Sequence, residues 1–165
     1  MQAATNAIAS SKDPRWDEFL IDLVQTDLGL TTGTKLRSLL GGAKPKPGRA
    51  TALVIATIGR RGNRAHVKLL LKALASDSPP LVQASIVEAL NELGDPSAID
   101  PLLAVGLEAK DHRLGWPVNQ AVLALAEPAT VGKVRKIVAS MKEGAPARGY
   151  YENLLQMLER KFPGQ

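Results

Sequence analysis

Apolar residues recur along this chain at helical spacing, three or four positions apart, over most of its length. After Pro14 the apolar stripe consists of Phe19, Leu20, Leu23, Val24 and Leu28. After Pro80 it consists of Val82, Ile86, Ala89, Leu90 and Leu93, and Gly94 is well placed to end that helix. No stretch alternates as a half-buried strand would, so the pattern predicts an all-α chain.

Proline indicates where many of these helices begin, because a residue in the first helical turn has no backbone N–H partner to lose. Proline precedes a helical stretch at six sites: Pro14, Pro79-Pro80, Pro96, Pro117, Pro128 and Pro146. The other predicted helices are Arg49–Ile58, Ala65–Ala75, Ala98–Leu107, Val118–Ala126, Ala129–Met141, Arg148–Phe162 and a short one at Thr34–Leu40.

The predicted helices partly repeat one another. A shift of 32 residues places Ile86 on Val118, Leu90 on Val122 and the pair Asp95-Pro96 on Glu127-Pro128. A shift of 35 in the other direction places Gly94 on Gly59, and extra residues at 60–64 then displace the second helix. A period of 32 to 35 residues predicts a short α-solenoid, a superhelix of antiparallel helix pairs that stack into one continuous core.

The chain divides into three predicted parts. Residues 1–12 have no positive segment and no sustained apolar run, so we expect a flexible leader. Residues 13–48 are expected to form a helical hairpin followed by a basic Pro/Gly loop, and the hairpin is either a degenerate repeat or a separate element. Residues 49–165 are expected to hold the helical repeats and a capping helix at the C-terminal end.

One stretch resembles a known family. Residues 84–103, with Ala89-Leu90, Leu93-Gly94-Asp95-Pro96, Ala98-Ile99 and Pro101-Leu102-Leu103, are similar to HEAT repeats of the type found in phycobilisome lyases. The resemblance implies a non-enzymatic scaffold or adaptor that holds a protein partner against the second helix of each pair. A third hypothesis that it leaves open is a lyase-like or chaperone subunit that acts on a tetrapyrrole protein. The His-Glu pairs of the di-iron deoxyhypusine hydroxylases are missing, because Val67 follows His66 and Arg113 follows His112.

The composition excludes several classes of chemistry. The chain has 165 residues, of which 45% are hydrophobic and 4% aromatic, and it has no cysteine. Thiol catalysis, disulfides and thiolate metal sites are therefore excluded. With two histidines and no phosphate-loop or nucleophile motif, we expect no enzyme activity, no cofactor and no metal. No apolar run is long enough to span a bilayer, so we expect a cytoplasmic protein with no membrane partner.

Charge is unevenly distributed. The formal net charge is +5, and no acidic residue lies between Asp27 and Asp77. That stretch holds ten basic residues: Lys35, Arg37, Lys44, Lys46, Arg49, Arg60, Arg61, Arg64, Lys68 and Lys72. We expect these residues, together with Trp116 in the loop Glu108–Pro117, to bind a partner. Lys68 and Lys72 lie four residues apart and should share one exposed helix face.

Two partners suit such a surface. The first is a protein with an acidic surface, which includes self-association. The alternative is sequence-nonspecific nucleic-acid binding, because clustered lysines and arginines release counterions when they meet a polyanion. No recognition helix with base-reading residues stands out and stacking aromatics are missing from the basic segment, which argues against sequence-specific readout. A basic face can also serve solubility alone.

Overall fold

The structure is a computed structural model that describes residues 2–30, 47–108 and 114–165. The described residues form α-helices, two short 3₁₀ helices and turns, with no strand among them. Contacts divide the chain into two compact units, Met1–Leu93 and Gly94–Gln165. The predicted helix Thr34–Leu40 lies outside the described residues.

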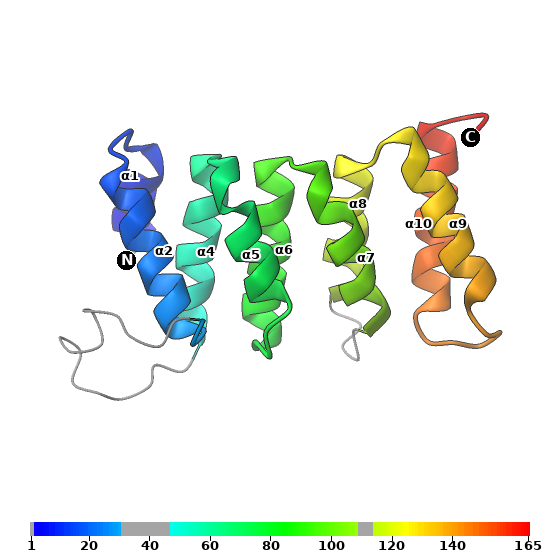
Figure 1. Cartoon of the computed structure of the whole chain (residues 1–165), viewed down its shortest axis with the longest axis horizontal. Helices are drawn as coiled ribbons and strands as arrows, with labels where there is room; N and C mark the ends of the chain where they lie inside the picture. Colours follow the sequence, from blue (N-terminus) through cyan, green and yellow to red (C-terminus); the bar gives the residue numbers. More distant parts are fainter. Residues whose placement is uncertain (1, 31–46, 109–113) are drawn as a thin grey trace. The chain divides into compact units, whose positions relative to one another are not determined.

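The first unit, unit 1, is built from helix pairs (Figure 1). Its elements are α1 (Gln2–Ser10), α2 (Arg15–Asp27), α4 (Arg49–Arg61), the 3₁₀ turn η1 (Arg64–His66), α5 (Val67–Leu74) and α6 (Pro80–Leu93). Helix α4 lies at the centre, where it packs against α1, α2 and α6. The core consists of fully buried aliphatic side chains such as Val24, Ile55, Leu70, Ile86 and Leu90.

Helices α4 and α6 cross very closely at Gly59. A Cβ atom at this position would lie 2.7 Å from the Cα of Ala89 and 2.9 Å from its Cβ. Atoms that are not bonded to each other cannot approach so closely, so the crossing depends on the missing side chain. Gly59 is therefore a packing glycine inside α4 and not the turn glycine that the 35-residue shift implied.

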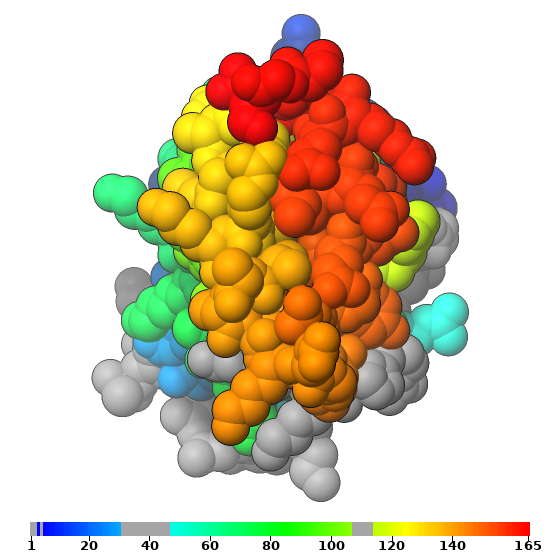
Figure 2. Space-filling model, turned by 90° about the vertical axis from the view of Figure 1, so that its right-hand side faces the viewer, coloured from blue at the N-terminus to red at the C-terminus, as the bar shows by residue number. Residues whose placement is uncertain are grey.

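The second unit, unit 2, contains η2 (Pro96–Ala98), α7 (Ile99–Glu108), α8 (Gly115–Leu125), α9 (Pro128–Ser140) and α10 (Arg148–Lys161). Helix α8 packs against α7 and α10, and α9 lies beside α10, as Figure 2 shows. The Tyr151 side chain of α10 is buried and its hydroxyl donates to the carbonyl of Leu103 in α7. The buried Asn119 amide of α8 donates to the carbonyl of Tyr150, at 3.0 Å.

The turns inside the helix pairs share one cap. The side-chain oxygen of Asn63 accepts from the N–H of Ala65 at 3.1 Å, and that of Asp95 accepts from the N–H of Ser97 at 2.9 Å. Each cap follows a glycine in the left-handed region, Gly62 or Gly94, with φ of 70° and 67°. This conformation favours glycine because a Cβ would strain it. The two turns are 32 residues apart, so the repeat has that period and the turn of unit 1 contains no extra residues.

The same cap occurs near the start of the chain. The Asp13 carboxylate accepts from the N–H of Arg15 at 2.9 Å, directly before α2. Residues 2–10, which we expected within a flexible leader, form α1, so α1 and α2 make a helix pair with the same cap. Arg60 and Arg61 of α4 hold α1 in place, a contribution that the short, weakly apolar sequence of α1 does not reveal.

The remaining helices lie within a few residues of their predicted bounds. The all-α, solenoid-like class that the sequence predicts is confirmed. One prediction was wrong in detail: Trp116 lies in the first turn of α8 and not in a loop, because Pro117 is accommodated inside that turn.

Candidate functional site

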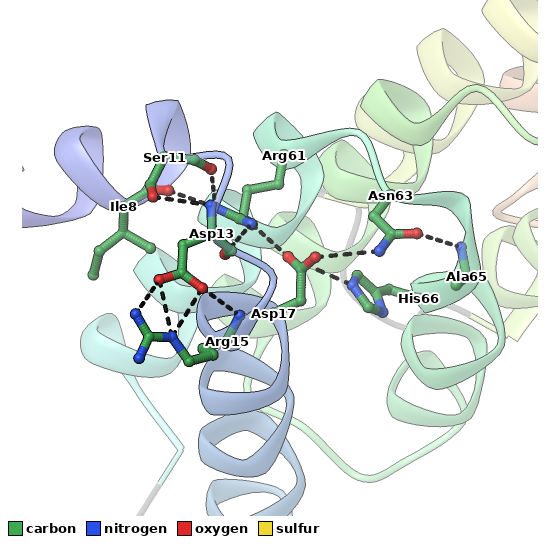
Figure 3. A network of polar contacts seen from close by, with 9 residues as sticks. All are labelled: Ile8, Ser11, Asp13, Arg15, Asp17, Arg61, Asn63, Ala65 and His66. Atoms are coloured by element: carbon green, nitrogen blue, oxygen red, sulfur yellow. Dashed lines mark hydrogen bonds and ion pairs between the residues drawn. The ribbon is translucent and has the colours of Figure 1, made fainter.

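Arg61 lies at the centre of a polar network in unit 1 (Figure 3). Its side chain is only 7% exposed, and its guanidinium pairs with the carboxylate of Asp17. The same guanidinium donates to the carbonyls of Ile8 and Ser11, at 2.7 Å each, and to that of Asp13 at 3.1 Å. These carbonyls belong to the end of α1 and to the turn before α2. Arg61 therefore ties the first helix pair to the second.

Asp17 is contacted from a second side (Figure 3). The Asn63 amide donates to the second oxygen of Asp17 at 3.2 Å, and the Nε2 atom of His66 lies 3.7 Å from the first. That Nε2 is buried and has no hydrogen-bond partner within the part of the chain that the structure describes. One carboxylate of α2 thus meets the end of α4, the turn and η1 together.

The pKa of the Asp17 carboxyl reflects this position. Partial burial raises it, but hydrogen bonds from Arg61 and Asn63 and the positive charge of Arg61 outweigh the burial, so the pKa lies below its usual 3.8. Asp17 is therefore ionised at neutral pH and acts as the anionic partner of Arg61.

Arg60 and Arg64 also make contacts inside unit 1. The Arg60 guanidinium donates to the side-chain oxygen of Asn6 in α1 at 3.0 Å. The Nε of Arg64 donates to the carbonyl of Leu93, at the end of α6, at 3.1 Å. The three arginines of the predicted surface that lie at this turn thus reach the neighbouring elements on either side of α4, although the side chains of Arg60 and Arg64 are themselves exposed.

Lys68 and Lys72 differ from the arginines. Both are exposed on α5, one helical turn apart, and no acidic residue of the described chain lies within ion-pair distance of either. The single polar contact of Lys72 is a long one, 3.5 Å to the carbonyl of Leu30, and Lys68 makes none among the described residues. Arg49, at the start of α4, is likewise exposed without an acidic partner in the described ranges.

The predicted surface residues therefore divide into groups. Lys35, Arg37, Lys44 and Lys46 lie outside the described residues. Trp116 belongs to unit 2, where it is 61% exposed on α8. Within unit 1, Lys68 and Lys72 lie together on one helix face, whereas Arg61 is internal.

The described residues contain no group of three His, Asp or Glu side chains that could hold a metal ion. Among the same residues, no helix has both the length and the apolar character needed to cross a membrane.

Helix pairs whose turns carry the same cap, with 32 residues between Asn63 and Asp95, define a helical repeat protein. The sequence family described as HEAT repeats matches residues 34–126, more than half of the chain, so the protein belongs to that family. HEAT repeats commonly mediate protein interactions. No curated protein matches the chain. The α1–α2 pair precedes the matched residues, although its turn carries the same cap.

The contact between Asp17 and Arg61 was not predicted from the sequence. Its partners are 44 residues apart, and Arg61 stands in the sequence as one of ten similar basic residues. The detectable signal was the recurrence of Asp13, Asn63 and Asp95 as caps. Counted from these caps, Asp17 lies four residues after the first and Arg61 two residues before the second.

Proposed function

We propose that the protein is a non-enzymatic scaffold that binds an acidic protein segment through the exposed lysines of α5. The observation that carries the proposal is the contrast between two kinds of cation in unit 1. Arg60, Arg61 and Arg64 contact the neighbouring helices, whereas Lys68 and Lys72 face solvent with no acidic partner among the described residues. Their charges contribute little to folding and remain open to a partner.

The position of α5 supports the same proposal. It is the second helix of its pair, and the second helices of HEAT-like pairs provide the partner-binding face. Half-buried Leu69 and Leu71 lie on α5 beside the lysines, so a partner would meet apolar and cationic side chains together. Trp116 of unit 2 is proposed as a separate contact, because an exposed tryptophan is a frequent anchor of interfaces.

The experiment compares partner capture by the full chain and by K68E/K72E. The matched control is K136E/R160E, which changes the net charge equally and replaces two exposed cations of unit 2 that have no acidic partner among the described residues. Captured proteins are quantified from extracts treated with nuclease. We expect a protein bound by wild type and control to be lost from K68E/K72E. A partner retained by K68E/K72E would contradict the proposed surface.

Nucleic-acid binding is the second candidate, favoured by the lack of acidic residues between Asp27 and Asp77. It predicts that labelled DNA and RNA of mixed sequence bind with similar affinity and that binding falls steeply with salt. Fluorescence anisotropy with the same three proteins measures this. Salt-sensitive binding that is lost in K68E/K72E and kept in K136E/R160E would favour this candidate over the protein partner.

A further inference from the structure

Helix α2 presents acidic residues at the positions where α5 presents lysines. Counted from the turn caps Asp13 and Asn63, Glu18 corresponds to Lys68 and Asp22 to Lys72. Their surroundings correspond too, because the core positions Leu20 and Val24 of α2 match Leu70 and Leu74 of α5. Glu18 and Asp22 lie two residues before and after Leu20, so they project from the side of α2 opposite the core, as Lys68 and Lys72 do on α5.

The two helices lie next to each other and run in the same direction. Near their N-terminal ends Asp17 and His66 are 3.7 Å apart, and beyond the end of α2 the carbonyl of Leu30 is 3.5 Å from the Nζ of Lys72. Ile21 and Leu69 are half-buried and continue the side of each helix on which Asp17 and His66 meet. An acidic column and a basic column therefore flank an apolar seam on one face of unit 1.

The four charges of these columns are not neutralised within the described chain. Glu18, Lys68 and Lys72 are exposed and Asp22 is partly exposed. None of the four has an ion-pair partner among the described residues, although the two columns lie on neighbouring helices. Each column is therefore available to charges of the opposite sign on another molecule.

We propose that this face binds a second copy of the chain in a symmetric dimer. A twofold axis between the columns and parallel to them places the acidic column of each copy on the basic column of the other, with Glu18 opposite Lys68 and Asp22 opposite Lys72. The face is thus complementary to itself, which a symmetric dimer requires. The proposal rests on the proposed function in one respect, because it uses the same lysines, and it names a second copy as their partner.

The test measures the mass of the purified full chain by sedimentation over a range of concentrations. We expect the wild type to form dimers at low ionic strength and to dissociate in about 1 M salt, where charges are screened beyond about 3 Å. The variants E18K/D22K and K68E/K72E each present a single sign of charge, so each should dimerise about tenfold more weakly or not at all. K136E/R160E should dimerise as the wild type does, and circular dichroism verifies that every variant is folded.

Two combinations of these variants distinguish the proposed pairing of columns from a nonspecific loss of association. A mixture of E18K/D22K with K68E/K72E should form mixed dimers, since a basic face then meets an acidic one. The quadruple variant E18K/D22K/K68E/K72E exchanges the two columns and should dimerise with itself again. Recovery in both combinations would identify the paired columns as the interface.

Three results would overturn the dimer: a wild type that stays monomeric at every concentration, double variants that dimerise as the wild type does, or combinations that fail to recover association. None of these results bears on partner capture from extracts, which tests the proposed function separately. If the wild type is monomeric and K68E/K72E still fails to capture a protein that the wild type captures, the dimer is excluded and the proposed scaffold function stands.

Discussion

The two units are held together internally by different interactions. In unit 1 the pair between Arg61 and Asp17, with side chains 7% and 17% exposed, joins successive helix pairs. Among the described residues of unit 2 the ion pairs lie at the surface, as with Lys133 and Asp100, which are 49% and 68% exposed, and the buried hydrogen bonds of Asn119 and Tyr151 are uncharged. The same residue types therefore have different roles, and burial decides between them.

This difference predicts how much each unit loses when a polar contact is removed. Withdrawing one partner of a buried ion pair leaves a charge without compensation, whereas withdrawing one partner of an exposed pair returns the other to water. The substitutions below test that contrast in order of expected effect, with the free energy of unfolding from urea denaturation as the measurement.

Arg61→Ala should have the largest effect. It leaves the Asp17 carboxylate without its ionic partner and removes the guanidinium hydrogen bonds to the carbonyls of Ile8, Ser11 and Asp13. We expect a loss of about 3–5 kcal/mol in the free energy of unfolding. The control is Arg60→Ala, which removes an exposed hydrogen bond to Asn6 and should cost about 1 kcal/mol. Equal losses in the two variants would show that burial does not distinguish these arginines.

The acid side of the same pair predicts a pH dependence. The pKa of Asp17 is lower in the folded protein than its usual 3.8, so its ionised form contributes stability above that value, and the contribution is lost as the pH falls through the folded pKa. Asp17→Asn keeps a similar shape but cannot ionise. The difference in unfolding free energy between wild type and Asp17→Asn should therefore be largest near neutral pH and shrink below about pH 4. A difference that is constant across this range would contradict the ionic role of Asp17.

Gly59→Ala tests packing in unit 1 against a matched glycine of unit 2. The new Cβ would meet the backbone of Ala89 at 2.7 Å, so α4 and α6 must move apart, at about 1–3 kcal/mol. Gly132, inside α9, has nothing within 4 Å of the same added atom. Gly132→Ala should instead stabilise by up to about 1 kcal/mol, because alanine favours the helix. Destabilisation by both substitutions would show that the close crossing is not the cause.

Much of this fold is readable from local sequence. The bounds of α6, α7, α9 and α10 follow from apolar spacing and from residues at helix ends such as Pro80, Gly94 and Pro128. Each of these residues lies within one helical turn of the helix end that it marks. Helix α1 was missed because tertiary contacts from Arg60 and Arg61, some 50 residues away, stabilise it.

For the candidate surface residues, local sequence likewise predicts the exposure of some side chains but not of others. The exposure of Lys68 and Lys72 follows from their spacing on one helix. The internal position of Arg61 depends on Asp17, which the sequence does not place beside it. Local patterns thus predict which side of a helix faces solvent, but they do not predict which charges the fold itself uses.

Tyr151→Phe probes an uncharged buried contact of unit 2. Burial raises the pKa of the Tyr151 phenol, which stays protonated and donates to the carbonyl of Leu103. Phenylalanine keeps the ring and removes this hydrogen bond, at about 1–2 kcal/mol. The loss should not change between pH 5 and 8, in contrast to the Asp17 variant. A marked change across this range would indicate that an ionisable group takes part in the contact.

Lys133→Ala should have the smallest effect. Its Nζ lies 2.6 Å from the Asp100 carboxylate, a short ion pair that joins α9 to α7, and distance alone would rank it among the strong contacts of the molecule. Both side chains are largely hydrated, however, so water replaces each partner when the other is removed. We expect a loss below about 1 kcal/mol that declines further with salt. A loss comparable to that of Arg61→Ala would mean that geometry, and not burial, determines what an ion pair contributes in this protein.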